Sequence, residues 1–238
     1  METIHIVGAG PGDPRLITVR GRELLDGADV LVYAGSLVHP VLVASCPAPE
    51  KIDSHGRNLE ELADLMAERA RSGLRVVRLH SGDPSLYGAI VEQMDALVDR
   101  GVHAEIVPGV SSIFAAAAAL TTQLTLKGVS ESLILTRPAG ETLDRDLIPE
   151  LSRHQQTLAV FLGTDQMEDI LSRVECPPET PAAVVYHASW DDQRVVTGTV
   201  ADVAAKAREA GIERTALIII GGVVDPARAG YRHSHLYS

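Results

Sequence analysis

Short apolar segments alternate along this chain with longer amphipathic segments, which is the pattern of β-strands joined by crossover helices. In the first half, the segments with strand character lie at residues 3–7, 29–33, 50–52, 75–79 and 105–107. In the second half, they lie at residues 132–136, 157–162, 182–187, 195–199 and 216–220. The pattern therefore predicts an α/β protein with two mainly parallel or mixed sheets of five strands each.

The clearest helix signal covers residues 59–72, where apolar side chains recur at helical spacing. Asn58 suits the N-cap position in front of this segment, and Gly73 ends the pattern. A second helix is predicted over residues 85–100, just before Gly101. Helices in these places connect one strand to the next, as a parallel sheet requires.

An alanine run at residues 115–119 predicts a helix with little side-chain bulk, which packs closely against its neighbours. After it, residues 120–130 lose any regular periodicity. We therefore predict two α/β domains, 1–120 and 121–238, a division that fits the length of the chain.

Composition narrows the classes of function. The chain has 238 residues, of which 45% are hydrophobic, and its formal net charge is -11. Nucleic acids and anionic membranes attract basic surfaces, so this charge argues against both as general partners. An acidic small-molecule substrate would need a locally basic pocket.

Cys46 and Cys176 lie far apart and lack metal-ligand spacing, so we expect neither a disulfide nor a metal site. The chain opens directly on a strand pattern without the segments of a signal peptide, and the cytoplasm is the expected location. The uncharged stretch 106–126 contains Pro108 and Gly109, so a turn and a buried helix are expected there rather than a membrane span.

Three loops rich in glycine and proline follow predicted strands. They are GAGPGDP at residues 8–14, HSGDPSLYG at 80–88 and VPGVSS at 107–112. Glycine lets the backbone approach a ligand without an intervening Cβ atom. Because ligands of open α/β sheets bind beyond the carboxyl ends of strands, we expect the three loops to form one site.

The loops favour some chemistries over others. The dinucleotide-binding fingerprint requires glycine where this chain has Asp13, which disfavours that alternative. Asp83 can accept hydrogen bonds from a ligand, or it can serve only as a turn or cap residue beside Pro84. The loops carry neither a Walker-type lysine nor a Ser-His-Asp set, which speaks against nucleotide hydrolysis and acyl transfer.

These loops, together with TLAVFLG at 157–163 and VVYHASW at 184–190, resemble the tetrapyrrole (corrin/porphyrin) methylase family in order and spacing. The resemblance implies that S-adenosylmethionine is bound in a cleft between two α/β domains, and that the protein is a homodimer. Carried over by position, the implied cofactor contacts are Pro11, Ser81, Gly82, Asp83, Leu86, Ser111, Ser112, Leu162 and Ala188.

Within the family, four segments are most similar to the members that methylate carbon 11 of precorrin-4 in cobalamin biosynthesis. They are YAGSLV at 33–38, SSIFAAAAAL at 111–120, LTLKGVSESLILTR at 124–137 and ASWDDQRVV at 188–196. The resemblance therefore implies an S-adenosylmethionine-dependent C-methyltransferase that gives precorrin-5.

The chain departs from the uroporphyrinogen III methylases of this family at two places. Those proteins usually carry aspartate where this chain has residues 34–35, and Lys-Arg-Ala-Gly where it has residues 54–57. The departures weaken a uroporphyrinogen assignment and remove the family's acid/base candidates. Water or one of Tyr87, Tyr33 and His80 remains to assist loss of a proton.

Precorrins carry acetate and propionate groups, which cationic side chains near loop ends can bind. The alternative is that these cations are ordinary solvated charges on the surface. Trp190 and Tyr186 can likewise stack on the macrocycle or simply pack. The candidate substrate cations are His55, Arg57, Lys127 and Arg137.

Several alternatives stay open at this point. Another precorrin or cobalt-precorrin methylase, a diphthine synthase or a ribosomal RNA ribose methylase would share the cofactor loops, although the acidic charge disfavours RNA. A binding module would keep the loops without turnover. The expected partner is a small-molecule tetrapyrrole, and the sequence leaves open whether it already holds cobalt.

Overall fold

The computed structural model describes residues 3–35 and 37–233, and the chain divides into two compact units, Met1–Ser112 and Ile113–Ser238. The division falls at the start of helix α5 (Ser112–Ala119) instead of after residue 120. The reason is packing: the buried face of α5 contacts the second sheet through residues such as Ile113 and Ala116. The alanine-rich helix therefore belongs to the second unit.

The first unit holds a sheet in which every neighbouring pair of strands is parallel. Its order is β3-β2-β4-β1-β5. The strands are β1 (Thr3–Gly8), β2 (Val30–Tyr33), β3 (Glu50–Asp53), β4 (Val76–His80) and β5 (His103–Val107). All five predicted strands of the first half are confirmed, and the carboxyl ends of all five lie at one edge of the sheet.

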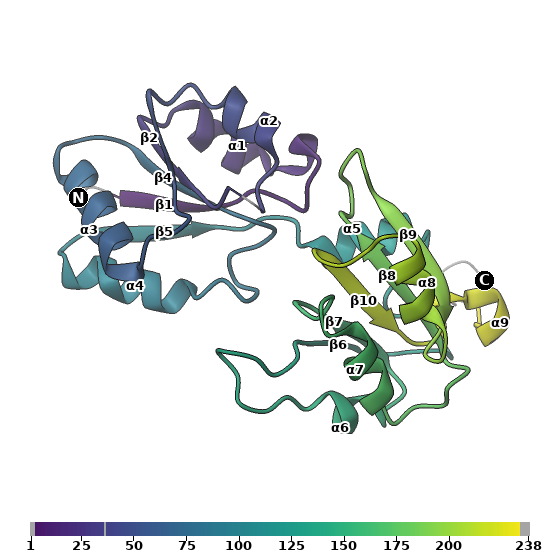
Figure 1. The fold of residues 1–238 in the computed structure, drawn as a ribbon. Helices are drawn as coiled ribbons and strands as arrows, with labels where there is room; N and C mark the ends of the chain where they lie inside the picture. Colours follow the sequence, from purple (N-terminus) through teal and green to yellow (C-terminus); the bar gives the residue numbers. More distant parts are fainter. Residues whose placement is uncertain (1–2, 36, 234–238) are drawn as a thin grey trace. The chain divides into compact units, whose positions relative to one another are not determined.

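Helices cover both faces of this sheet (Figure 1). One face packs against α1 (Val19–Asp26) and α2 (Pro40–Ser45), with the short 3-10 helix η1 (Pro14–Leu16) ahead of them. The other packs against α3 (Leu59–Arg71) and α4 (Ile90–Asp99). Apolar side chains alternate between the two layers, so both sides of the sheet are buried.

Helix α3 begins and ends where the sequence predicts. The Asn58 side chain accepts from the backbone N–H of Glu61, and the Glu61 carboxylate accepts from the backbone N–H of Asn58, which completes a capping box. Gly73 has a φ of +80°, a left-handed conformation that ends a helix without a steric penalty.

Helix α4 begins at Ile90, so the predicted start at Ser85 was wrong. Tyr87 and Ala89 have φ values of 55° and 46°, which lie outside a right-handed helix. The segment between β4 and α4 is therefore a loop, and it lies at the carboxyl edge of the sheet.

The second unit holds a mixed sheet of order β6-β7-β10-β8-β9, in which β6 and β7 are parallel and the other pairs are antiparallel. The strands are β6 (Leu133–Thr136), β7 (Thr157–Val160), β8 (Pro181–Tyr186), β9 (Arg194–Thr199) and β10 (Ala216–Ile220). The predicted strands are all present, although β7 and β8 end before Leu162 and His187. Both of those residues have positive φ values, which strands do not allow.

Helix α5 packs on one face of the second sheet, and the cluster on the other face is filled by residues of α6 (Ile148–Ser152), α7 (Met167–Arg173) and α8 (Val203–Glu209). The chain continues through η2 (Gly222–Val224) and α9 (Pro226–Ala229). Within residues 3–35 and 37–233, no helix combines the length and the apolar character needed to cross a membrane.

Candidate functional site

The three predicted loops meet at the carboxyl edge of the first sheet, after the adjacent strands β4, β1 and β5. The backbone N–H of Ala9 donates to the carbonyl of His80 at 2.7 Å. Gly10 and Gly82 exchange two backbone hydrogen bonds of 3.2 and 2.9 Å. The loops after β1 and β4 are thus joined backbone to backbone.

Glycine is required where the third loop meets the other two. A Cβ atom on Gly109 would lie 2.2 Å from the carbonyl oxygen of Gly82 and 2.8 Å from the Cα atom of Gly8. A Cβ atom on Gly8 would lie 2.5 Å from the Cα atom of Gly109. Both spacings are far below van der Waals contact, so the three backbones approach as closely as they do only because no side chain intervenes.

Asp83 ties the loop after β4 to the loop after β5. Its Oδ1 atom accepts from the backbone N–H of Ser85 at 2.9 Å, and its Oδ2 atom accepts from the backbone N–H of Gly109 at 2.8 Å. Burial alone would raise the pKa of this carboxyl group, but the hydrogen bonds from Ser85 and Gly109 outweigh it and hold the pKa below its usual range. Asp83 is therefore ionised at neutral pH and has the turn role that the sequence allowed.

Seven of the nine predicted cofactor contacts lie in these three loops. Gly82 has a φ of +60°, and a Cβ atom placed there would meet nothing closer than the Cα atom of Ser111 at 3.9 Å. The backbone of Gly82 therefore lies directly beside the turn that leads into α5. The seven residues are Pro11, Ser81, Gly82, Asp83, Leu86, Ser111 and Ser112.

The other two predicted contacts, Leu162 and Ala188, lie at one edge of the second sheet, where β7 and β8 end and β10 begins. Leu162 is 62% exposed with a φ of 54°. Ala188 is buried between His187 and Ser189, whose φ values are 46° and 72°. Non-glycine residues in this region cost conformational energy and concentrate at functional sites, so this edge is a second candidate binding region.

The three proton-transfer candidates have different surroundings. The His80 ring lies half-buried with Nδ1 2.9 Å from the carbonyl oxygen of Ser81, and burial lowers its pKa. Tyr33 packs in the cluster under α1 and α2, on the opposite face of the sheet from His80. Tyr87 is 41% exposed in the loop after β4. His80 is thus the candidate with a ring that is neutral at physiological pH and held in place.

The four predicted substrate cations do not gather at one place. His55 and Arg57 are exposed in the loop after β3, at the same sheet edge as the glycine loops. Arg137 follows β6 and donates to the hydroxyl and carbonyl oxygens of Thr142 at 2.7 and 3.0 Å. Lys127 precedes β6 and so lies at the opposite edge of the second sheet from Leu162, with its Nζ 3.3 Å from the carbonyl oxygen of His233.

The aromatic residues of the second unit stack on one another. The rings of Tyr186 and His187 are 3.8 Å apart, and those of His187 and Trp190 are 4.8 Å apart. The guanidinium of Arg194 lies 4.4 Å from the Tyr186 ring. Tyr186 and Trp190 thus pack against neighbouring side chains. The two rings also border the edge of the second sheet that contains Ala188.

A model of the tetrapyrrole (corrin/porphyrin) methylases matches residues 3–204. The chain belongs to this family. Among curated relatives, the cobalt-precorrin-4 C(11)-methyltransferase of Methanocaldococcus jannaschii is 48% identical, over 98% of this chain and 92% of that protein. The precorrin-4 C(11)-methyltransferase of Pseudomonas aeruginosa is 43% identical, over 99% of this chain and 95% of that protein.

Solved structures of this family have the same fold. The X-ray structure of a cobalt precorrin-4 methyltransferase of cobalamin biosynthesis superposes with a TM-score of 0.90 at 43% identity, covering 94% of this chain and 97% of the other. The uroporphyrin-III C-methyltransferase from Thermus thermophilus, complexed with S-adenosylhomocysteine, superposes with a TM-score of 0.80 at 32% identity, covering 93% and 98%. Two α/β units with sheets of this kind are thus the architecture of the methylase family.

No sequence motif marks Arg78 as a candidate site residue. Arg78 lies inside β4 and is only 7% exposed. Among the residues that the structure describes, nothing accepts a hydrogen bond from its Nε or Nη1 atoms. The available signal was a lone arginine within the apolar strand VVRLH, where burial of a charge calls for a reason.

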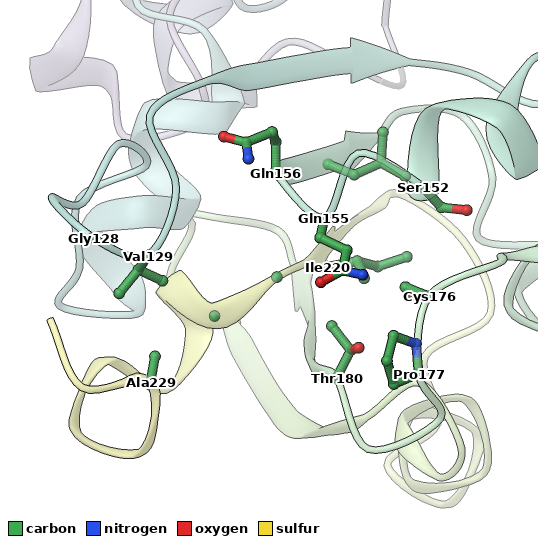
Figure 2. Close-up of a pocket in the computed structure, with 13 residues that line it drawn as sticks. Gly128, Val129, Ser152, Gln155, Gln156, Cys176, Pro177, Thr180, Ile220 and Ala229 are labelled. Carbon is green, nitrogen blue, oxygen red and sulfur yellow. The ribbon is translucent and has the colours of Figure 1, made fainter.

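A separate pocket of about 250 Å³ lies at the other edge of the second sheet, where β7 begins and β10 ends (Figure 2). Ser152, Cys176, Thr180 and Gly221 are among its lining residues, and none of the predicted site residues is. Burial raises the pKa of the Cys176 thiol, which keeps the thiol protonated at neutral pH. Across residues 3–35 and 37–233, no group of three or more metal-ligating side chains is found.

Proposed function

We infer that this methylase transfers a methyl group to carbon 11 of the precorrin-4 macrocycle, giving precorrin-5, a step of cobalamin biosynthesis. The observation that carries the inference is similarity over nearly the whole chain, at 43–48% identity, to proteins named for methylation at this position. The similarity includes both units, so it covers the glycine loops of the first sheet and the edge of the second sheet that contains Leu162 and Ala188.

We propose S-adenosylmethionine as the methyl donor. A family member with 32% identity binds its product, S-adenosylhomocysteine, and the loops of this chain suit such a ligand. The backbone of Gly82 lies beside Ser111 and Ser112, two residues that carry hydroxyl groups. In the first unit, the proposed contacts are the seven loop residues named above; in the second, they are Leu162 and Ala188.

When bound, S-adenosylmethionine supplies a methyl group on a positively charged sulfur, which an electron-rich ring carbon can attack directly. The residues of this chain then contribute by holding the two reactants in place and excluding water. Loops joined backbone to backbone, with Asp83 bonded across to Gly109, are rigid enough for that role. Because burial lowers its pKa, His80 has a neutral ring that can accept a proton if one must leave the product.

The acceptor is proposed with or without cobalt. Relatives named for cobalt-precorrin-4 are 48% and 44% identical, and relatives named for precorrin-4 reach 44%, so similarity does not separate the two. The homodimer and the cytoplasmic location remain proposals that rest on the family resemblance and on the two free cysteines.

The test is a single-turnover reaction with S-adenosylmethionine labelled with ¹³C on its methyl group. Precorrin-4 and cobalt-precorrin-4, each prepared enzymatically, are the two acceptors. We expect S-adenosylhomocysteine and labelled product in equal amounts, with the label on carbon 11 by NMR. Label on another carbon would indicate a different precorrin methylase, and donor binding without any product would indicate a binding module.

A further inference from the structure

Arg78 has an unusual position for an arginine. It lies on β4, inside the first sheet, with Ile6 of β1 and Val32 of β2 as its strand partners. More than nine-tenths of the residue is buried, and two of its three side-chain nitrogens have no hydrogen-bond acceptor within residues 3–35 and 37–233. Leaving a buried charged donor unpaired is costly, so native proteins rarely keep one without a reason.

The carboxylate of Asp53 does not supply the missing hydrogen bonds of the Arg78 guanidinium. Burial lowers the pKa of Arg78, and the negative charge of Asp53, at the end of β3, partly opposes this. The Oδ1 atom of Asp53 instead accepts from the backbone N–H groups of Gly35 and His55, at 3.1 and 2.9 Å. Asp53 thus attracts the guanidinium from a distance without forming a hydrogen bond to it.

Arg78 lies two residues before the end of β4, close to the sheet edge where the glycine loops meet. Arg78 shares a sheet face with His80, two residues further along β4 and directly before the loop that contains Gly82. On the other side of β4 lie β2 and β3, and the loop after β3 carries the exposed side chains of His55 and Arg57. In the order of the sheet, the strand of Arg78 therefore lies between β1, which leads into a glycine loop, and the strands β2 and β3.

We propose that Arg78 binds a carboxylate of the tetrapyrrole acceptor. The inference rests on the proposed function, because the acetate and propionate groups of a precorrin would supply the carboxylate. A carboxylate supplies acceptor oxygens in the geometry that a guanidinium fork matches, and the low dielectric around a buried arginine strengthens the bond. The amino-acid end of S-adenosylmethionine also bears a carboxylate, so the experiment separates the two sources.

The test compares Arg78→Met and Arg78→Lys with the wild type, using Arg75→Met as the control. Arg75 directly precedes β4 and is paired with Asp29 at the opposite edge of the sheet. Binding of uroporphyrin III is followed by fluorescence quenching, binding of S-adenosylhomocysteine by calorimetry, and stability by thermal unfolding. KM and kcat for precorrin-4 complete the set.

For Arg78→Met we expect tetrapyrrole affinity to fall by about 10- to 100-fold, the range for loss of a charged hydrogen bond. KM should rise more than kcat falls, and Arg78→Lys should recover part of the affinity. Affinity for S-adenosylhomocysteine should stay within about twofold of wild type, as for Arg75→Met. The unfolding temperature should not fall, because methionine removes an unpaired buried charge.

Two outcomes would overturn the proposal. If Arg78→Met unfolds at a much lower temperature and its folded fraction still binds uroporphyrin normally, the arginine is structural. If affinity for S-adenosylhomocysteine is lost and uroporphyrin binding is unchanged, the carboxylate belongs to the methyl donor. Failure of the wild type to methylate precorrin-4 would count against the proposed function instead, and the uroporphyrin measurement would still test Arg78.

Discussion

The Oδ2 atom of Asp83 accepts a hydrogen bond of 2.8 Å from the backbone N–H of Gly109, so a carboxylate that follows β4 fixes the loop that follows β5. The two residues are 26 positions apart in sequence, and strand β1 lies between their strands in the sheet. Three loops from three parallel strands are thereby joined into one unit at the edge where the donor is proposed to bind.

Asp83→Asn tests this connection with little change in size. Asparagine has a single accepting oxygen, so it cannot accept from both Ser85 and Gly109 as Asp83 does, and loss of a hydrogen bond to a charged group costs about 1.5–3 kcal/mol. We expect S-adenosylhomocysteine to bind about 10-fold or more weakly by calorimetry. Asp29→Asn is the control, because Asp29 pairs with Arg75 at the opposite edge of the sheet. Equal affinity in both variants would show that the Asp83 bond does not organise the site.

Gly109→Ala tests the close approach of the three backbones. The added methyl group would collide with the carbonyl oxygen of Gly82, and overpacking of this kind costs about 1–3 kcal/mol. We expect a lower free energy of unfolding in urea and weaker binding of S-adenosylhomocysteine. Gly140→Ala is the control, because a Cβ atom there meets nothing within 4 Å. A Gly109→Ala protein as stable as the control would contradict the contact.

His80 should make the protein less stable as the pH falls. Burial lowers its pKa below the ordinary value of 6.5, so below that pH the unfolded chain takes up a proton that the native ring resists. The contribution to stability is complete above pH 6.5 and decreases as the pH drops toward the native pKa. We expect urea unfolding at pH 7.5 and 5.5 to show a smaller loss for His80→Asn than for wild type. His103→Asn, at an exposed position of β5, should behave as wild type; an equal loss in all three proteins would be evidence against the effect.

The second unit should lose stability in a more acidic range. The guanidinium of Arg208 donates to the Glu168 carboxylate at 2.7 and 2.9 Å and lowers the Glu168 pKa to about 2 from an ordinary value of 4.5. The resulting stabilisation is complete above pH 4.5 and disappears as the pH falls through about 2. Glu168→Gln should be less stable than wild type at pH 5, and the difference should shrink toward pH 2.

The matched control for that measurement is Glu209→Gln, an exposed glutamate on the same helix as Arg208. Thermal unfolding at four pH values between 5 and 2 follows both variants, and the control should follow wild type throughout. A constant difference between Glu168→Gln and wild type over this range would show that the ion pair does not respond to pH as described.

Much of the fold was predictable because periodicity and local chemistry decide it. The ten strands and the capped helix α3 follow from patterns within a few residues, as with Asn58 and Glu61. Predictions failed where the backbone leaves the ordinary conformations. Nothing in the side chains of Tyr87, Leu162 or His187 signals a positive φ, so α4, β7 and β8 were all predicted too long.

The three glycine-rich loops that follow strands, and membership of the family, can be read from the amino-acid sequence. Which backbone groups those loops share depends on the fold, because the order β4-β1-β5 brings Gly8, Gly82 and Gly109 together from distant parts of the chain. The same holds for Arg78. Its residue type is visible in the strand VVRLH, but whether a buried guanidinium finds an acceptor depends on every neighbour that the fold places around it.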